Sequence, residues 1–359
     1  MSKRKYSLLA VVSLMVAGTL LLAACAGSAV PPPTATSAPL PTAVPVNTEP
    51  PAATEAPTAV PTEAPTAIPE PVTVKIGVLP IIDALPMFVA QDKGYFEANS
   101  VKVEFVPVAS AAERDQLIQA GEIDGMINDM ISTILFNKDA VQVVAVGFSR
   151  VATDTYPQFR ILASAQSGIT TVDGLKGVEI GVSDGTVIAY TTDRLLQAEG
   201  FTADDIKTIA VPKIPDRLAL LGSGELKAAN LPDPLASLAV AGGAVVIIDD
   251  TKHPEYGYSL YTFTAKFAAD HPGAVKGFLA AVYQAAADIN ADKTQWDGLL
   301  ADQALLPQPL QGNYTLPDYP TGDVPSEDQF NDVLAWAKDK GIVAADVSYT
   351  DSVSANFLP

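Results

Sequence analysis

The sequence predicts an α/β fold with two similar lobes, each a mostly parallel sheet with helices on both faces. From residue 72 onward, β-branched strand segments alternate with helical segments, which is typical of parallel sheets covered by helices. The order of elements then repeats. Ile76-Gly77-Val78 and Ile180-Gly181-Val182 are 104 residues apart, and the Gly-Glu pairs that begin at 121 and 224 are 103 residues apart.

The individual elements follow from β-branched runs and from the glycines that end helices. In the first lobe we expect strands at 72–79, 101–108, 123–127 and 141–148, and helices at 86–96, 111–120 and from about 131. In the second lobe we expect strands at 178–182, 206–211, 226–231 and 245–249, and helices at 186–199, 216–221 and 234–241.

The first 25 residues predict an export signal. Lys3, Arg4 and Lys5 precede an apolar run over 7–22, and Leu22-Ala23-Ala24-Cys25 follows. This arrangement is typical of a secretory signal peptide. The last four residues resemble the bacterial lipoprotein box, in which the cysteine is lipidated; the alternative is an ordinary cleavage site. We expect a signal peptide at 1–24 and a lipidated Cys25 that anchors the protein on the extracytoplasmic side of a membrane, in the periplasm or at the cell surface.

Residues 25–71 predict a disordered tether. The part from 30 to 71 contains 13 of the chain's 29 prolines and eight threonines, and it has no aromatic residue. Such a segment buries too little apolar surface to offset the entropy of ordering. Because proline favours an extended chain, we expect a stalk between the lipid anchor and the lobes.

Composition excludes several classes of protein. The net charge is −19, whereas a nucleic-acid binder needs a basic face, so we expect no nucleic-acid partner. The only cysteine is Cys25, and the only histidines are His253 and His271. One cysteine and two histidines are too few for an intrachain disulfide and provide few ligands or catalytic groups for a metal site or an active site. The sequence also contains no nucleotide-binding fingerprint. We therefore expect no metal, no cofactor and no catalytic residues.

Three segments carry a family resemblance. Residues 75–129 contain VAQDKGYFE, VEFVPV and AGEID, residues 167–186 are SGITTVDGLKGVEIGVSDGT, and residues 265–285 are AKFAADHPGAVKGFLAAVYQA. Their order and spacing resemble the nitrate, sulfonate, taurine and thiamine-precursor (NMT1-like) group of ABC-importer substrate-binding proteins. The resemblance implies a two-lobed periplasmic binding protein fold of type II. It also implies a receptor that captures a small molecule and delivers it to an ABC permease.

In that family the chain crosses twice between the lobes, and the candidate crossings here are 158–165 and 258–265. Lobe 1 would comprise 72–158 plus 265–359, and lobe 2 would comprise 159–264. Two hinge strands permit closure over a ligand. We expect a monomer whose partners are a small-molecule ligand, an importer permease and a membrane reached only through the lipid anchor.

Ligands of open α/β sheets bind beyond the carboxyl ends of the strands, which points to four loops. The candidate ligand-binding residues in these loops are Ile82, Asp83, Leu85, Pro86, Asn128, Asp129, Met130, Asp184, Gly185, Thr186, Pro232 and Asp233. Because a helix follows each loop, an aspartate there can instead cap the helix. We expect capping for Asp184 and Asp233, and we leave both roles open for Asp129. Asp83 is expected to point either inward or to solvent.

Few basic residues lie near these loops. We expect Arg114 and Arg217, which lie on helices, to be solvated or to cap, whereas Arg150, which with Arg160 flanks a polar stretch, could reach the mouth of the cleft. Four aromatic residues could stack on a planar ligand, although rings at such positions more often belong to a core: Phe88, Phe148, Tyr156 and Tyr190.

The loops carry carboxylates rather than Lys or Arg, so we expect a neutral or cationic organic ligand, such as a heterocyclic vitamin precursor. An anion such as a sulfonate, taurine or nitrate is the second choice. Asp129 would accept a hydrogen bond from an amino group of the first kind of ligand. An enzyme on the same fold and a purely structural lipoprotein are alternatives of other classes, which turnover and ligand binding respectively would distinguish.

Overall fold

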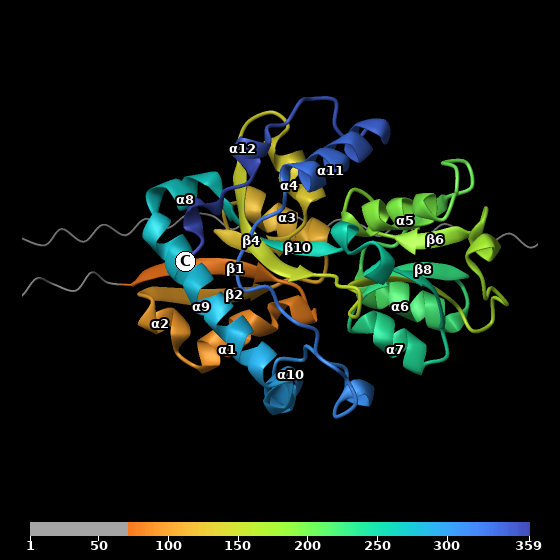
Figure 1. Cartoon of the computed structure of the whole chain (residues 1–359), viewed down its shortest axis with the longest axis horizontal. Coiled ribbons are helices and arrows are strands. Elements are labelled where there is room, and N and C mark those ends of the chain that lie inside the picture. Colours follow the sequence, from red (N-terminus) through yellow and green to blue (C-terminus); the bar gives the residue numbers. More distant parts are fainter. Residues whose placement is uncertain (1–70) are drawn as a thin grey trace, which may run out of the picture. The chain divides into compact units, whose positions relative to one another are not determined.

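The computed structural model describes residues 71–359, which belong to one compact unit. The expected signal peptide, the lipidated Cys25 and the tether lie outside the described residues. Within 71–359, no helix is both long and apolar enough to cross a membrane. Figure 1 shows two lobes in this unit, each a sheet with helices packed against it.

Lobe 1 is built on a sheet with the strand order β2-β1-β3-β10-β4. β1 pairs in parallel with β2 and β3, whereas β10 runs antiparallel to β3 and β4. Four strands therefore share one direction. The strands are β1 (Val72–Val78), β2 (Val101–Pro107), β3 (Gly125–Asn128), β4 (Val143–Val151) and β10 (Tyr258–Thr264).

Lobe 2 repeats this arrangement with the order β7-β6-β8-β5-β9, in which β5 is the antiparallel strand. β6 takes the place of β1, and β5 takes the place of β10. The α/β class, the mostly parallel sheets and the internal repeat predicted from sequence are thus confirmed. The strands are β5 (Phe159–Ala163), β6 (Glu179–Val182), β7 (Lys207–Ala210), β8 (Ala228–Pro232) and β9 (Val245–Asp249).

Helices cover both faces of each sheet because consecutive strand residues point to opposite faces. In lobe 1, Ile127 packs among residues of α1 and α9, whereas Met126 packs among residues of α3 and α4. In lobe 2, α5 covers one face, and α6 and α7 cover the other. The helices of these layers are α1 (Leu85–Asp92), α2 (Tyr95–Ala98), α3 (Ala111–Gln119), α4 (Met130–Asn137), α5 (Val187–Ala198), α6 (Ile214–Ser223), α7 (Leu235–Ala241) and α9 (Pro272–Ala291).

Helix boundaries agree with the sequence within a few residues, with one exception. The single helix expected over 86–96 is divided into α1 and α2. Gly94 lies between them with φ of 71°, a left-handed conformation that interrupts a right-handed helix and that glycine adopts without strain.

The chain after lobe 2 returns to lobe 1 and also contacts lobe 2. It contains α8 (Ala265–Asp270), α10 (Asp297–Asp302), α11 (Glu327–Asp339) and α12 (Tyr349–Ser352) in addition to α9. Asp332 of α11 accepts hydrogen bonds from Tyr190 and Arg194 of α5, and Trp336 donates to Asp193 at 2.7 Å. The lobes are therefore joined by a third contact besides the two crossings.

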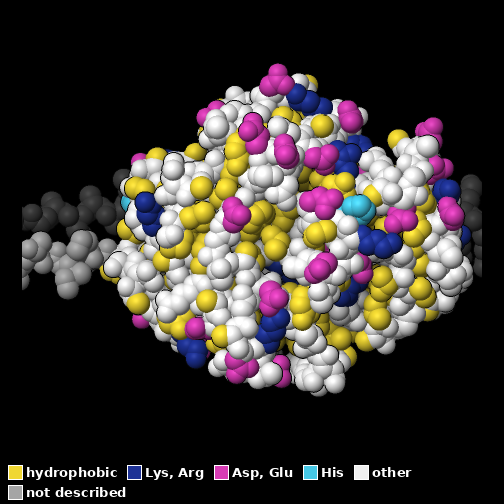
Figure 2. All heavy atoms as spheres, viewed as in Figure 1, with side chains coloured by type: hydrophobic (Ala, Val, Ile, Leu, Met, Phe, Trp, Pro, Cys, Tyr) yellow, Lys and Arg dark blue, Asp and Glu magenta, His cyan; other side chains and the backbone are white. Residues whose placement is uncertain are grey.

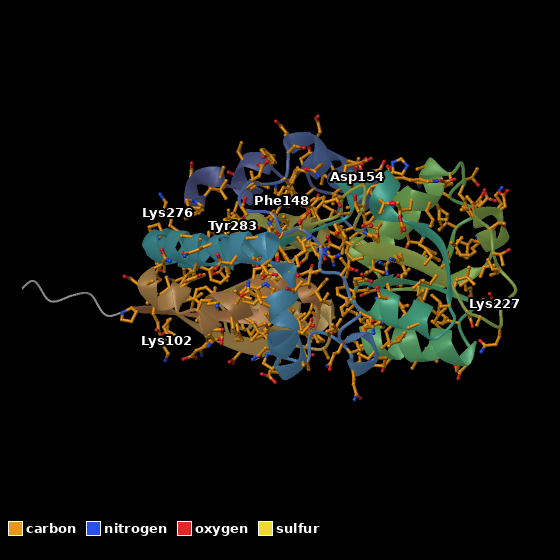
Figure 3. All side chains as sticks on the ribbon, turned by 60° about the horizontal axis from the view of Figure 1, so that its bottom comes forward. Lys102, Phe148, Asp154, Lys227, Lys276 and Tyr283 are labelled. Atoms are coloured by element: carbon orange, nitrogen blue, oxygen red, sulfur yellow. The ribbon has the colours of Figure 1, made fainter. Side chains whose placement is uncertain are left out.

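The two crossings lie just before the segments expected from sequence. The chain leaves the lobe 1 sheet at the end of β4 and enters the lobe 2 sheet at the start of β5, through 152–158; it returns through 250–257. The segment 258–264, which we expected to be a crossing within lobe 2, is β10 and pairs with β3 and β4 of lobe 1. Asp154, in the first crossing, lies where the two lobes meet (Figure 3).

Candidate functional site

A cavity of about 70 Å³ lies between the lobes. Its lining comes from the segments at and after the carboxyl ends of β1, β2 and β3 in lobe 1 and of β6, β7 and β8 in lobe 2. This is the edge at which ligands of open α/β sheets bind. Gln158 of the first crossing, Phe159 of β5 and Ser259 of β10 complete the lining of the cavity. Most of its surface is apolar, and it contains four ionisable side chains: Asp83, Asp129, Arg114 and Arg217.

The structure brings together five of the twelve candidate residues around this cavity: Asp83, Asn128, Asp129, Thr186 and Pro232. Four others are buried but do not line the cavity, and these are Ile82, Leu85, Pro86 and Met130. Asp184 is exposed and Gly185 is half-buried. The expectation that Asp184 caps a helix is wrong, because Thr186 accepts from the amide of Ile188 and caps α5.

Asp233 belongs to a different hollow on the lobe boundary. Its carboxylate accepts two hydrogen bonds from Arg160, at 2.7 and 3.2 Å, and one from Tyr314 at 2.9 Å. It also accepts from the amide of Ser237 in the first turn of α7 at 3.1 Å, but Asp233 lies one residue before the N-cap position, which Pro234 occupies without a side-chain cap. With these partners the carboxylate is already neutralised.

Arg150 is buried rather than at the mouth of the cleft. Its guanidinium lies 3.5 Å from Asp83 and donates to the carbonyl oxygen of Pro157 at 2.7 Å. The four aromatic candidates also do not line the cavity. Phe148 and Tyr190 are buried in a hydrophobic core, and Phe88 packs edge-on against Phe105.

The expectation that Arg114 and Arg217 are solvated or act as caps is wrong. Both are buried, with 2% and 0% of their surface exposed, and both line the cavity. They are 103 residues apart, which is the offset of the internal repeat, and they occupy the same position in α3 and α6. The repeat was the signal in the sequence that could have paired them.

Two equivalent glycines lie against the stems of these arginines. A Cβ at Gly77 of β1 would lie 3.6 Å from Cγ of Arg114, and a Cβ at Gly181 of β6 would lie 3.3 Å from Cγ of Arg217. The same two Cβ atoms would lie 2.7 Å from Cδ1 of Ile123 and 2.6 Å from Cδ1 of Leu226, respectively. The glycines therefore chiefly allow Ile123 and Leu226 to pack on these strands, beside the arginine stems.

The two arginines differ in their partners. Nε of Arg114 donates to Asp115 Oδ1 at 2.8 Å, and Nη2 lies 2.7 Å from the same oxygen. The position equivalent to Asp115 in the repeat is Leu218. Arg217 donates only to the carbonyl oxygen of Val211, at 2.8 Å, and its Nε and Nη2 have no hydrogen-bond partner. Burial lowers the pKa of Arg217 to about 10, so it is charged at neutral pH.

Asp129 caps a helix, and its burial favours the neutral form of the carboxyl group. Its carboxylate accepts from the amide of Ser132 at 2.8 Å and so caps α4. Burial raises the pKa of Asp129, and Arg114 and the Ser132 amide only partly offset this effect. The Val187 amide of α5, in the other lobe, also lowers its pKa, so the carboxylate faces helix starts of both lobes.

The four ionisable groups of the cavity thus leave one charge without a counterion. Asp83 is paired with Arg150, Arg114 is paired with Asp115, and burial favours the neutral form of Asp129. Among residues 71–359, no carboxylate lies within salt-bridge distance of Arg217. A buried guanidinium without a partner is unfavourable by itself, and an anion in the cavity would satisfy it.

A hydrogen-bond network connects the cavity to both crossings. Asp83 accepts from Nε2 of Gln158 at 3.0 Å and from the hydroxyl of Ser259 at 2.6 Å. Asp250 accepts from the amides of Gln158 and Phe159 at 2.9 and 3.0 Å. Two buried aspartates therefore hold the end of the first crossing next to the cavity. Asp83 binds the side chain of Gln158, and Asp250 binds its main chain.

Comparisons with known proteins agree with this architecture. A family model described as the NMT1-like family matches residues 67–297. The chain is 25% identical over 248 residues to a Bacillus subtilis protein named "Putative aliphatic sulfonates-binding protein", covering 65% of this chain and 73% of that protein. It is 24% identical over 214 residues to the 4-amino-5-hydroxymethyl-2-methylpyrimidine phosphate synthase of Candida albicans, covering 56% of this chain and 62% of that enzyme.

A solved structure shares the fold at lower identity. The periplasmic aliphatic sulphonate binding protein SsuA from Escherichia coli superposes with a TM-score of 0.67 and 22% identity, covering 80% of this chain and 99% of that chain. The family model spans well over half of the sequence and includes the loops that form the cavity. The chain belongs to the NMT1-like family.

Proposed function

We propose that this protein is an extracytoplasmic solute-binding receptor of an ABC importer and that its ligand is a small organic anion, such as an aliphatic sulfonate. The two-lobed fold and the family support the receptor role. Arg217 is the observation that carries the ligand class, because its buried guanidinium lines the cavity without a counterion. The similarity to a sulfonate-binding protein supports the same class.

This proposal reverses the order of ligands expected from the sequence. The carboxylates that favoured a cation already have partners, since Asp83 is paired with Arg150 and Asp233 with Arg160. Asp129 caps a helix. A cationic ligand would instead be placed beside Arg217 and Arg114, and like charges at close range repel.

An enzyme on this fold is the second candidate, favoured by the similarity to the pyrimidine phosphate synthase. The cavity supports it less well. Its lining, formed by residues within 71–359, contains no histidine, cysteine or lysine. The hydroxyls of Ser183, Thr186 and Ser259 therefore have only carboxylates in the lining as possible general bases. Incubation of the protein with a ligand that it binds, followed by analysis for product, tests this candidate.

A ligand screen tests the proposed class directly. We expect ethanesulfonate and related short organic anions to raise the melting temperature, because a ligand at 100 times its Kd stabilises the folded state by about 2.7 kcal/mol. The matched probe is 4-amino-5-hydroxymethyl-2-methylpyrimidine, which carries an amino group and no anionic group. Stabilisation by the pyrimidine and not by any anion would contradict the proposal.

We also propose that Cys25 carries the lipid anchor, which rests on the Leu22-Ala23-Ala24-Cys25 motif. Changing Cys25 to Ala should move the protein from the membrane fraction to the soluble extracytoplasmic fraction, because a lipid chain is what holds the tether at the membrane. Fractionation and immunoblotting measure this. A Ser28→Ala variant, changed three residues further on, should remain with the membrane. Membrane attachment of Cys25→Ala would exclude this anchor.

A further inference from the structure

Gln158 is the one residue of the first crossing whose main chain and side chain are both held by aspartates. It is buried and lines the cavity. Its amide N–H donates to Asp250, and its side-chain Nε2 donates to Asp83 at 3.0 Å. The side chain therefore has a defined position next to the space between the lobes.

The orientation of the Gln158 amide follows from the chemistry of its partner. An ionised carboxylate can only accept hydrogen bonds, so the nitrogen of the amide must face Asp83. Asp83 is held as an acceptor by two other donors, the hydroxyl of Ser259 and the guanidinium of Arg150. The amide cannot be turned over without placing its oxygen against the carboxylate.

This orientation leaves Oε1 of Gln158 buried and without a hydrogen-bond partner. Buried amide oxygens in proteins nearly always have one. The cavity thus has unpaired polar atoms of two kinds among its lining residues. The donors are Nε and Nη2 of Arg217 and Nη2 of Arg114, which has an ion pair with Asp115 but no hydrogen bond. The acceptor is Oε1 of Gln158, and much of the remaining lining is apolar, including Ile81 and Ile214.

We propose that Gln158 is a specificity-determining residue whose Oε1 accepts a hydrogen bond from the ligand. The ligand is then a bifunctional organic anion. Its acidic group binds at Arg217, and a hydroxyl or amino group binds at Gln158, with a short carbon chain between them. This inference rests on the proposed function, because it assigns the second end of the same ligand.

The experiment compares ligands that differ only at that second end. Isothermal titration with ethanesulfonate, 2-hydroxyethanesulfonate and 2-aminoethanesulfonate should show at least tenfold tighter binding of a donor-bearing compound by the natural protein. A site that hydrogen-bonds a ligand hydroxyl or N–H rejects the analogue without it, because its own polar atom is left unpaired. In Gln158→Met the ratio between the donor-bearing compound and ethanesulfonate should fall to nearly one.

Ser149→Ala is the matched control. It removes a buried hydroxyl that donates to the carbonyl oxygen of Asp83 at 3.1 Å but lies outside the cavity lining and leaves Oε1 of Gln158 in place. It should change the affinities for both kinds of ligand in parallel and keep their ratio, which separates recognition by Oε1 from a general disturbance of the crossing. Circular dichroism and melting curves show that each variant is folded.

The outcomes distinguish this inference from the function on which it rests. If the natural protein binds ethanesulfonate as tightly as its hydroxyl and amino derivatives, the receptor for organic anions stands and the role of Gln158 is refuted. A preference that survives in Gln158→Met refutes it as well. If none of the three sulfonates binds, the proposed ligand class itself fails.

Discussion

Replacing Arg217 with methionine should weaken the binding of ethanesulfonate by at least tenfold. A hydrogen bond to a charged group contributes about 1.5–3 kcal/mol, and every 1.4 kcal/mol corresponds to about tenfold in Kd. The melting temperature of the ligand-free protein should not fall, because methionine occupies a similar volume and removes a buried charge that has no counterion. Titration calorimetry and melting curves measure the two effects.

A second variant tests the charge of Arg217 without removing it. Leu218 stands where the first lobe has Asp115, so Leu218→Asp should reproduce the Arg114–Asp115 pair in lobe 2. The new carboxylate would neutralise Arg217 and should weaken anion binding about tenfold. Ala219→Asp adds the same charge at the next, exposed position of α6 and should change Kd less than threefold.

These two variants also show what would overturn the role of Arg217. If Arg217→Met binds ethanesulfonate with unchanged affinity, the cavity does not use this guanidinium for its ligand. Equal losses in Leu218→Asp and Ala219→Asp would mean that the overall negative charge of lobe 2, and not the pairing of Arg217, weakens binding.

Raising the pH from 5 to 8 should remove a stabilising contribution of Asp250. Burial raises the pKa of this carboxyl from 3.8 to about 7, against the opposing effect of the Gln158 and Phe159 amides. The folded protein therefore holds a proton that the unfolded chain has released above about pH 4. The free energy of unfolding therefore falls as the pH rises from 5 through 7. The total decrease over this range is about 3 kcal/mol, which corresponds to a decrease in Tm on the order of 6 °C.

Asp250→Asn isolates this contribution. The variant cannot titrate at this position, so the melting temperature of the natural protein minus that of the variant should decrease steadily from pH 5 to pH 8. Asp154→Asn is the control, because it makes the same substitution at an exposed position of the first crossing. Parallel melting profiles for the natural protein and Asp250→Asn would show that Asp250 does not take up a proton on folding.

The surface of the protein gives little indication of the charge at the site. Acidic side chains are spread over both lobes on the face seen in Figure 2, in keeping with the net charge of −19. At physiological ionic strength, charges beyond about 8 Å are largely screened. We therefore expect the few charged groups at the cavity, among them Arg217 and Arg114, to decide the ligand class. The net charge of the whole chain does not decide it.

Periodic and composition-based signals in the sequence predicted the elements, because they depend on near neighbours. The strand over 245–249 agrees with β9, and Gly200 follows the end of α5. The repeat at 103–104 residues was sufficient to predict two similar lobes. The loops after strands were predicted to form the site, and five residues of these loops line the cavity: Asp83, Asn128, Asp129, Thr186 and Pro232.

Only the tertiary structure decided which side chains line the cavity and which of their charges have a partner. Arg114 and Arg217 were misjudged because an arginine on a short helix is ordinarily solvated. Both are buried where residues of the two lobes meet around the cavity, and these residues are distant in sequence. In the cavity, Asp83 is neutralised by Arg150, which is 67 residues away in the sequence. In the neighbouring hollow, Asp233 is neutralised by Arg160, which is 73 residues away. A local pattern records which charges are present, but long-range contacts determine which of them are neutralised.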